Sequence, residues 1–227
     1  MNKADLQIAK QSVTLRAAVE EKIRQAIISG VFAPGQRLVE RQLCEAIGVG
    51  RTSIREALRQ LEAEGLIINY PHRGPVVSGI TREEAEQLYQ VRALLESLAG
   101  EQFALNGTDE DIRNLEAAVA EFEKVARRKD RSAIIEAKTK FYGLLMEGSG
   151  NMFVRQMLTL LHNRVTLLRI TSMMQPGRLS ESVLEIKEIL AAIKDRDGPR
   201  AAAACKRHIE LAARVALDYL HQNPTAG

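Results

Sequence analysis

The sequence has few of the residues on which catalytic and metal sites depend. Its 227 residues include two cysteines and four histidines. Cys44 and Cys205 are far apart and belong to no Cys-x-x-Cys or Cys/His spacing that suggests zinc, so we expect two buried thiols. The sequence has no Ser/His/Asp elbow and no glycine loop of the kind that cradles a phosphate. Together these absences argue against an enzyme.

Long apolar segments are missing as well. No run of about 18 apolar residues occurs, so we expect no membrane association. The start of the chain, MNKADLQIAKQ, lacks the apolar core of a secretion signal, which favours a cytoplasmic location. We expect a flexible arm at residues 1–11 and a frayed tail at residues 223–227.

Charge of one sign is only slightly in excess. The formal net charge is +3, and residues 1–80 hold 11 Lys and Arg against 8 Asp and Glu, whereas the rest of the chain holds 21 of each. A field this weak does not indicate nucleic-acid binding by itself. The length and the 45% hydrophobic content suit two modest globular domains.

What is present is a helix, a break, a second helix and a hairpin in one run. Apolar residues recur at helical intervals on both sides of the break Gly48-Val49-Gly50. Beyond the second helix, residues 66–68 and 75–77 are typical of short strands around a turn. This order of elements predicts a winged helix-turn-helix, which binds DNA, at residues 12–79.

The second of these helices begins with small, polar and basic residues. Arg51, Thr52 and Ser53 form its first turn, and Arg55 follows one turn later. Exposed amides and hydroxyls at a helix start favour an anion, and arginine offers a donor fork suited to guanine or phosphate. The alternative is that these arginines are one solvated helix face. The coincidence of helix, turn, helix and wing favours DNA.

At these residues the chain resembles the winged helix-turn-helix of GntR-type bacterial transcription regulators. The resemblance runs from about Leu15 to Val77 and rests on the R-T-S-I-R-E-A-L core and the H-R-G of the wing. The chain departs from the family at Gly50, where serine or threonine is usual and would supply a helix cap or a phosphate contact. The resemblance implies that eight residues contact double-stranded DNA, namely Arg41, Arg51, Thr52, Ser53, Arg55, His72, Arg73 and Gly74.

Residues 80–222 carry the pattern of an all-helical domain. The predicted helices, separated by Gly, Pro, Asn, Asp or Ser, are 82–105, 109–128, 131–147, 152–173, 181–195 and 198–221. Thr81, Thr108 and Ser180 mark helix starts. The predicted fold is therefore mainly α, with an N-terminal winged helix-turn-helix and a C-terminal six-helix bundle.

The first helix of this domain has an apolar stripe that we expect to face the core. The stripe consists of Leu88, Val91, Leu95 and Leu98. Beside it, Arg92 and Glu96 have the i, i+4 spacing that is often only a surface ion pair.

The helical domain resembles the ligand-binding (FCD) domain of the FadR-like branch of GntR regulators, in its six-helix, VanR-like form. Many members of that branch bind a divalent metal through one Asp and three His. The corresponding positions here are Lys138, Tyr142, Ile186 and His208, of which only the last is a histidine. An ammonium, a phenol and an isoleucine do not replace two imidazoles and a carboxylate, so we expect no metal and no other cofactor.

The same positions suggest a small-molecule effector. If Lys138 faces the domain's cavity, it places a positive charge where relatives hold a metal, and a carboxylate-bearing effector is then expected. Arg92, Tyr142 and His208 are further candidates for contacts with it. The alternative is that Lys138 extends to solvent and that His208 is a core or surface residue without a ligand.

A single winged helix covers few base pairs, so specific binding requires two copies on a two-fold symmetric site. The resemblance implies a homodimer on a palindromic operator, usually a repressor, that responds to an effector in the helical domain. Residues 78–80 are the expected hinge. An alternative is a DNA-binding protein whose helical bundle only dimerises and binds no effector.

Overall fold

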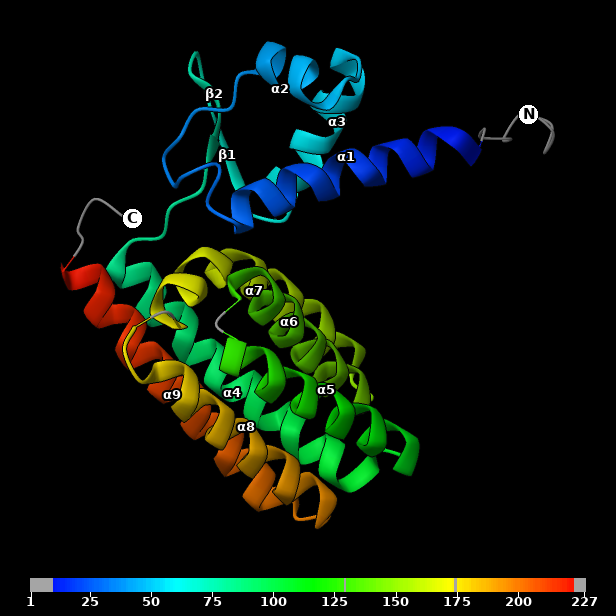
Figure 1. The fold of residues 1–227 in the computed structure, drawn as a ribbon, viewed down its shortest axis with the longest axis vertical. Helices are drawn as coiled ribbons and strands as arrows, with labels where there is room; N and C mark the ends of the chain where they lie inside the picture. Colours follow the sequence, from blue (N-terminus) through cyan, green and yellow to red (C-terminus); the bar gives the residue numbers. More distant parts are fainter. Residues whose placement is uncertain (1–9, 129, 174, 223–227) are drawn as a thin grey trace. The chain divides into compact units, whose positions relative to one another are not determined.

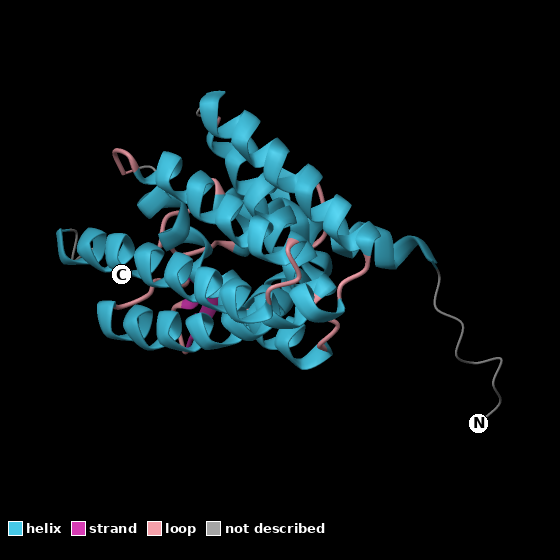
Figure 2. Cartoon of the chain, turned by 90° about the horizontal axis from the view of Figure 1, so that it is seen from below, coloured by secondary structure: helices cyan, strands magenta, loops and turns pink. Residues whose placement is uncertain are grey.

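The computed structural model describes residues 10–128, 130–173 and 175–222 (Figure 1). Within these residues the chain forms nine helices and two strands, and helices dominate its secondary structure (Figure 2). It divides into two compact units between Gly79 and Ile80. Residues 1–9 of the predicted arm and the predicted tail at 223–227 lie outside the described residues. The last two residues assigned to the arm, Lys10 and Gln11, instead begin the first helix.

The first unit contains three helices and a two-stranded hairpin (Figure 1). Its elements are α1 (Lys10–Ile28), α2 (Glu40–Ile47), α3 (Arg51–Ala63), β1 (Ile67–Tyr70) and β2 (Gly74–Val77). Its core is apolar because each helix buries one stripe at helical spacing. The buried side chains include Ile23, Ile27, Leu43, Ile54, Leu58 and Leu61. The predicted helix-turn-helix is confirmed.

The break between α2 and α3 depends on Gly48, which ends α2 in the left-handed conformation at φ 78°. Its amide donates to the carbonyl of Cys44, and the chain then turns into α3. A residue with a Cβ is strained at this φ, so glycine suits the position. Gly50 caps α3 without any side-chain hydrogen bond, as its departure from the family pattern implies.

The wing is an antiparallel hairpin. β1 and β2 pair in a register that sets Ile67 opposite Val77 and Tyr70 opposite Gly74. At the tip, His72 adopts φ 65°, a left-handed conformation that histidine tolerates better than most residues with a Cβ. The strand predictions are confirmed, but β1 begins one residue and ends two residues later than predicted, and β2 begins one residue earlier.

The second unit is a six-helix bundle. Its helices are α4 (Arg82–Asn106), α5 (Asp109–Arg128), α6 (Arg131–Gly148), α7 (Met152–Met173), α8 (Arg178–Lys194) and α9 (Gly198–Gln222). The predicted segments match these bounds within three residues. Phe103, Phe122 and Phe141 are fully buried at its centre.

Two of the three predicted helix starts are confirmed. Thr81 and Glu84 form a reciprocal capping box at the start of α4, and the Thr108 side chain accepts from the Asp111 amide at the start of α5. Ser180 is wrong, because α8 already begins at Arg178, after Gly177.

The predicted inward stripe of α4 is wrong in part. Leu88 is buried and Leu95 packs against the core, but Val91 is 47% exposed and Leu98 is 37% exposed. The inward face instead carries Arg92 and Glu96, each 1% exposed, so this pair is not a surface pair. The buried face of α4 therefore holds an ion pair among apolar residues, and its exposed face carries several large apolar side chains.

The cysteines are both free thiols, as expected, but only Cys205 is buried, and Cys44 is half-buried. Among the residues described in the structure, no helix is long and apolar enough to cross a membrane.

Candidate functional site

The first turn of α3 is polar and exposed to solvent. Arg51, Thr52 and Arg55 are exposed and Ser53 is half-buried, because the opposite face of α3 is held in the core by Ile54. The first amides of a helix have no partner within the helix, so this turn offers N–H donors as well as arginine side chains. These donors at the first turn of α3 suit a negatively charged ligand such as a phosphate group.

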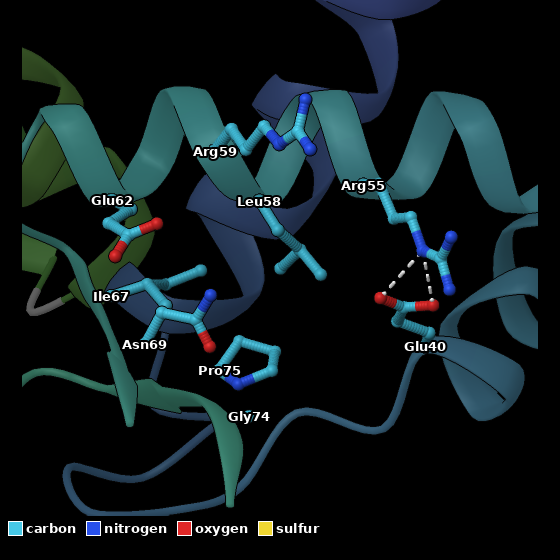
Figure 3. Close-up of a pocket in the computed structure, with 9 residues that line it drawn as sticks. All are labelled: Glu40, Arg55, Leu58, Arg59, Glu62, Ile67, Asn69, Gly74 and Pro75. Carbon is cyan, nitrogen blue, oxygen red and sulfur yellow. Dashed lines mark hydrogen bonds and ion pairs between the residues drawn. The ribbon is translucent and has the colours of Figure 1, made fainter. Parts of the chain in front are cut away.

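Arg55 is held by a residue of α2. Its Nε–H donates to both carboxylate oxygens of Glu40, at 3.0 and 2.9 Å (Figure 3). The Arg55 side chain is still 59% exposed. The guanidinium is therefore pre-positioned at the surface, and its nearest partner carries a charge of the same sign as a phosphate.

A groove of about 300 Å³ separates α3 from the wing. Leu58 projects from α3 toward the wing and forms the floor with Ile67 and Pro75, whereas charged side chains stand at the rim (Figure 3). The lining residues are Glu40, Arg55, Leu58, Arg59, Glu62, Ile67, Asn69, Gly74 and Pro75. Two of the predicted DNA contacts, Arg55 and Gly74, thus share one groove.

The remaining predicted DNA contacts lie at the wing and on α2. His72 and Arg73 are exposed at the tip of the hairpin, and Gly74, the first residue of β2, is half-buried next to them. Arg41 lies on α2, with its side chain 75% exposed and its Nε 3.8 Å from a carboxylate oxygen of Glu45. All eight residues belong to the first unit. Six of them are exposed, and Ser53 and Gly74 are half-buried.

In the second unit, the four predicted effector contacts converge in the interior. His208 Nε2 lies 3.2 Å from Lys138 Nζ and 3.0 Å from the Tyr142 hydroxyl. The Arg92 guanidinium lies over the Tyr142 ring, 5.7 Å from its centroid. Lys138 is 2% exposed and His208 is 1% exposed, so the alternative in which Lys138 extends to solvent is wrong.

Four further polar residues join them: Glu96, His162, Arg178 and Glu185. The sequence-based prediction did not include the last three as site residues, and it placed Glu96 in a surface ion pair. Arg92 donates to Glu96 Oε1 at 2.9 and 2.7 Å, and the same oxygen lies 2.9 Å from His162 Nε2. Glu96 and His162 are 66 residues apart in the sequence, so local spacing does not reveal their contact. We call the complete set the polar cluster: Arg92, Glu96, Lys138, Tyr142, His162, Arg178, Glu185 and His208.

The other side of the polar cluster is built on α8 and α9. Arg178 donates through both terminal nitrogens to the two oxygens of Glu185, at 2.6 and 2.7 Å. A Glu185 oxygen also lies 2.5 Å from His208 Nδ1. Arg178, Ser182 and Glu185 repeat at helical spacing on a buried face of α8, and this polar stripe is the signal that the sequence offered.

The environment fixes the charge states of the polar cluster. Burial raises the pKa of Glu96 and of Glu185, but the adjoining arginine and histidine side chains outweigh it and lower each to about 2. Burial and the nearby Lys138 ammonium lower the pKa of His208 to about 4 although Glu185 opposes them. His208 is therefore neutral at pH 7, donates from Nδ1 to Glu185 and has its lone pair at Nε2.

The polar cluster does not suit the divalent metal ion that the family resemblance brought into question. Ile186, at one of the expected ligand positions, is fully buried in the apolar core, and its neighbour Glu185 is the residue that meets His208. Both Glu185 oxygens are engaged by Arg178, and the Nε2 of His208 faces the Lys138 ammonium and the Tyr142 hydroxyl. A dication needs several converging anionic or neutral donors, which these positions do not offer.

Comparisons with known proteins agree with both units. The family model for bacterial regulatory proteins of the gntR family matches residues 15–77, and that for the FCD domain matches residues 87–211. The uncharacterized HTH-type transcriptional regulator YdhC of Bacillus subtilis is 29% identical over 189 residues, which cover 83% of this chain and 83% of that protein. The galactonate operon transcriptional repressor of Escherichia coli is 25% identical over 209 residues, covering 83% and 90%.

A solved structure has the same fold. The structure of E. coli McbR/YncC superimposes with a TM-score of 0.79 at 21% sequence identity, and the match covers 96% of this chain and 100% of that one. The winged helix-turn-helix and the helical bundle therefore occur together, in this order, in a protein of known structure.

Proposed function

The chain belongs to the gntR family of bacterial regulatory proteins, with an FCD domain, and is a DNA-binding transcription regulator; we propose that it represses transcription from a palindromic operator, as a homodimer controlled by a small acidic metabolite. The single observation that carries the DNA-binding part is the exposed, arginine-rich start of α3 beside the groove and the wing. Because bacterial chromosomal DNA lies in the cytoplasm, we place the protein there, and we assign it no enzymatic activity.

In this proposal α3 enters the major groove of DNA, and the wing contacts the adjoining backbone. Arg51, Thr52, Ser53 and Arg55 meet base edges or phosphates at the helix start. Arg41 lies on the helix that braces α3 and contacts the backbone. The wing residues contact the DNA backbone as well. They are His72, Arg73 and Gly74.

The homodimer is supported by an apolar outer face on the helical bundle. α4 and α7 are neighbours, joined by an ion pair of 3.6 Å between Glu84 and Arg164. Each presents large exposed apolar side chains at helical spacing: Val91, Leu94 and Leu98 on α4, and Phe153, Met157 and Leu160 on α7. Large exposed apolar side chains gathered on two neighbouring helices suit an interaction site. We propose that two copies pair through this α4/α7 face.

Effector control is supported by the polar cluster. Several buried charges in one bundle are costly and are seldom kept for stability alone, so they point to a ligand site. The proposed contacts are Lys138, Tyr142 and His208, with Arg92 as a more distant contributor. The relatives named as gluconate and galactonate operon repressors are similar to this chain, and their names connect them with sugar acids. We propose an acidic metabolite here as well.

Control requires that the effector bind two arrangements of the dimer unequally. DNA must then change the affinity for the effector by the same factor as the effector changes the affinity for DNA. We propose residues 78–80, between the two units, as the hinge. The alternative, a bundle that only dimerises, requires no ligand and predicts that no small molecule alters DNA binding.

The experiment begins with selection of duplexes from a random-sequence pool by the purified protein. The proposal predicts enrichment of one two-fold symmetric site, and then release of that site by at least one member of a panel of organic acids. A protein that enriches no sequence is not a specific regulator. A protein that enriches a site but responds to no acid fits the alternative with a purely structural bundle.

A further inference from the structure

We propose that Arg37 and Tyr70 form a second phosphate-binding site of the DNA-binding unit, on the face of the wing that is turned away from α3. The site holds the DNA strand that lies beyond the wing, across the minor groove. The inference rests on the proposed entry of α3 into the major groove. It adds two residues that are not among the eight predicted DNA contacts.

The segment that precedes α2 extends the hairpin of the wing. The Leu38 amide donates to the Pro75 carbonyl at 2.8 Å, and Arg37 forms an antiparallel bridge with Val76. These contacts hold the segment along β2. The backbone of Arg37 therefore belongs to the wing, although Arg37 precedes both helices of the helix-turn-helix in the sequence.

The register decides which face of the wing carries Arg37. Residues opposite one another in paired strands point to the same face, and neighbours along a strand point to opposite faces. Val76 is opposite both Arg37 and Ile68. Arg37 therefore shares a face with Ile68, and with Tyr70 two residues further along β1. Ile67 lies on the other face and lines the groove beside α3 (Figure 3). Arg37 and Tyr70 are both exposed on the face turned away from α3.

This outer face carries a hollow of about 560 Å³. The hollow is lined by Arg37, Asn69, Tyr70, Pro71, His72 and Gly74. Its guanidinium, phenol and amide are donors of the kinds that bind phosphate oxygens. None of the lining residues is acidic, whereas the groove between α3 and the wing is lined by Glu40 and Glu62. The hollow is therefore the more favourable of the two places for a phosphate.

The Arg37 guanidinium is available to such a ligand. Arg37 is exposed, and its side chain has no hydrogen bond or ion pair with any residue that the structure describes. Arg24 and Arg55 of the same unit, by contrast, are held by Glu64 and Glu40. An arginine without a carboxylate partner can present its whole donor fork to a phosphate.

The dimensions of B-DNA bring a strand to this face. With α3 in the major groove, one strand passes between α3 and the wing, and the wing lies over the adjoining minor groove. That groove is only about 6 Å wide, so its far strand runs along the outer face of the wing. The near strand then meets the groove that Arg55 lines, and the far strand meets the hollow that Arg37 lines.

The test measures by fluorescence anisotropy how the affinity for the selected duplex changes with salt concentration. Each phosphate that a protein neutralises contributes about 0.9 to the slope of log affinity against log salt concentration. Arg37→Gln should reduce the slope by about that amount per bound chain, and it should weaken binding to the selected and the scrambled duplex by a similar factor. Arg37→Lys keeps the charge and should keep the slope. Tyr70→Phe removes only a hydroxyl, so it should weaken binding at an unchanged slope.

Lys22→Gln is the matched control. Lys22 is an exposed cation on α1 of the same unit, and it lines neither the groove nor the hollow. The substitution removes the same charge as Arg37→Gln and should leave the slope nearly unchanged. An equal change in the two variants would mean that Arg37 acts only through the overall charge of the unit, which overturns the inference.

A second measurement locates the phosphate. Single phosphates of the selected duplex are replaced in turn by uncharged methylphosphonates. On the far strand of each half-site, we expect one position at which the replacement weakens binding of the wild type but not of Arg37→Gln. That pattern assigns the phosphate to Arg37.

The inference is overturned if Arg37→Gln keeps the wild-type slope, if it loses affinity for the selected duplex alone, or if no phosphate of the far strand affects the wild type. Wild-type affinity of Tyr70→Phe overturns the role of Tyr70. The methylphosphonate measurement on the wild type decides even if Arg37→Gln fails to fold. A wild type that selects no duplex refutes the proposed regulator, whereas unchanged binding by Arg37→Gln to a duplex that the wild type does select refutes this inference alone.

Discussion

The Nε–H of Arg55 on α3 is shared between the two carboxylate oxygens of Glu40, the first residue of α2, at 3.0 and 2.9 Å. The contact aims the guanidinium at the surface beside the groove between α3 and the wing (Figure 3). It also sets a negative charge next to the proposed path of the DNA backbone. Glu40 therefore has two opposite effects on DNA binding: it orients Arg55, and its carboxylate repels the DNA phosphates. Two substitutions separate these effects.

Arg55→Ala removes the guanidinium from the exposed face of α3. We expect a loss of about 1–3 kcal/mol in the free energy of binding to the selected duplex. If Arg55 reads a base, the loss is concentrated on the selected sequence and specificity falls. Fluorescence anisotropy with the selected and a scrambled duplex measures both affinities. Uniform weakening identifies a phosphate contact, and unchanged affinity for both removes Arg55 from the interface.

Glu40→Gln keeps the shape of the partner and removes its charge. We expect tighter binding to every duplex, because a carboxylate near phosphates is lost, and a smaller ratio between selected and scrambled duplexes, because Arg55 is held less firmly. The same anisotropy measurement at one salt concentration checks this. Glu210→Gln is the control, since Glu210 is an exposed acid of the helical unit that contacts Lys206 only loosely, at 3.9 Å, and its loss should leave the affinity for every duplex unchanged. Weaker binding of Glu40→Gln to all duplexes would contradict the expectation.

Sequence periodicity predicted the elements of this chain well, because helices and strands are specified by neighbours three, four or two residues away. Its errors on α4 have a common cause. Val91 and Leu98 were assigned to the core since apolar stripes usually face inward, but the buried face of α4 carries Arg92 and Glu96. Such departures from the pattern are expected at functional sites.

The polar cluster could be predicted only in part. Lys138, Tyr142 and His208 were found through the family resemblance, which aligns them with metal ligands. Glu185 was missed because that alignment points to its neighbour Ile186, and a one-residue offset on a helix turns a side chain by about 100°. Contacts between α4 and α7, such as that of Glu96 with His162, join residues that no local pattern connects.

Leu94→Glu tests the dimer face on α4. Leu94 is 67% exposed, so the substitution leaves the fold of one chain intact but sets a charge in the proposed interface. We expect the dissociation constant of the dimer to increase by at least about tenfold, and the affinity for the symmetric duplex to fall in parallel. Sedimentation velocity measures the first quantity. Leu184→Glu, at a position on α8 that is 68% exposed, should remain dimeric, and similar behaviour of the two variants would rule out the α4/α7 face.

The lowered pKa of His208 predicts a pH-dependent stability. The unfolded chain binds a proton at a pKa near 6.5, whereas the folded protein resists it until pH is about 4. Stability therefore falls as pH drops from 6.5 to 4, and roughly 2 kcal/mol of unfolding free energy is lost between pH 7 and pH 5. Denaturant unfolding of wild type and His208→Gln at both pH values measures it. Equal pH dependence in the two proteins would remove His208 as the cause.

A glycine fixes the close approach of α4 and α9. A Cβ built on Gly100 lies 2.5 Å from Cys205 Sγ and 3.1 Å from the Ala201 carbonyl oxygen. We expect Gly100→Ala to destabilise the protein by about 1–3 kcal/mol, because the neighbouring backbone limits how far the helices can adjust. Gly143→Ala on α6 is the matched control, since nothing lies within 4 Å of its built Cβ. It should stabilise by about 0.5–1 kcal/mol, and chemical denaturation compares the two variants.

The most direct test of the central claim is the ratio of affinities for the selected duplex and for a scrambled duplex of equal length, measured by anisotropy at one salt concentration. A specific regulator of this kind should prefer the selected duplex by about 10³-fold or more, with two chains bound per duplex. Equal affinity for the two duplexes, or one chain bound to each, would contradict the account.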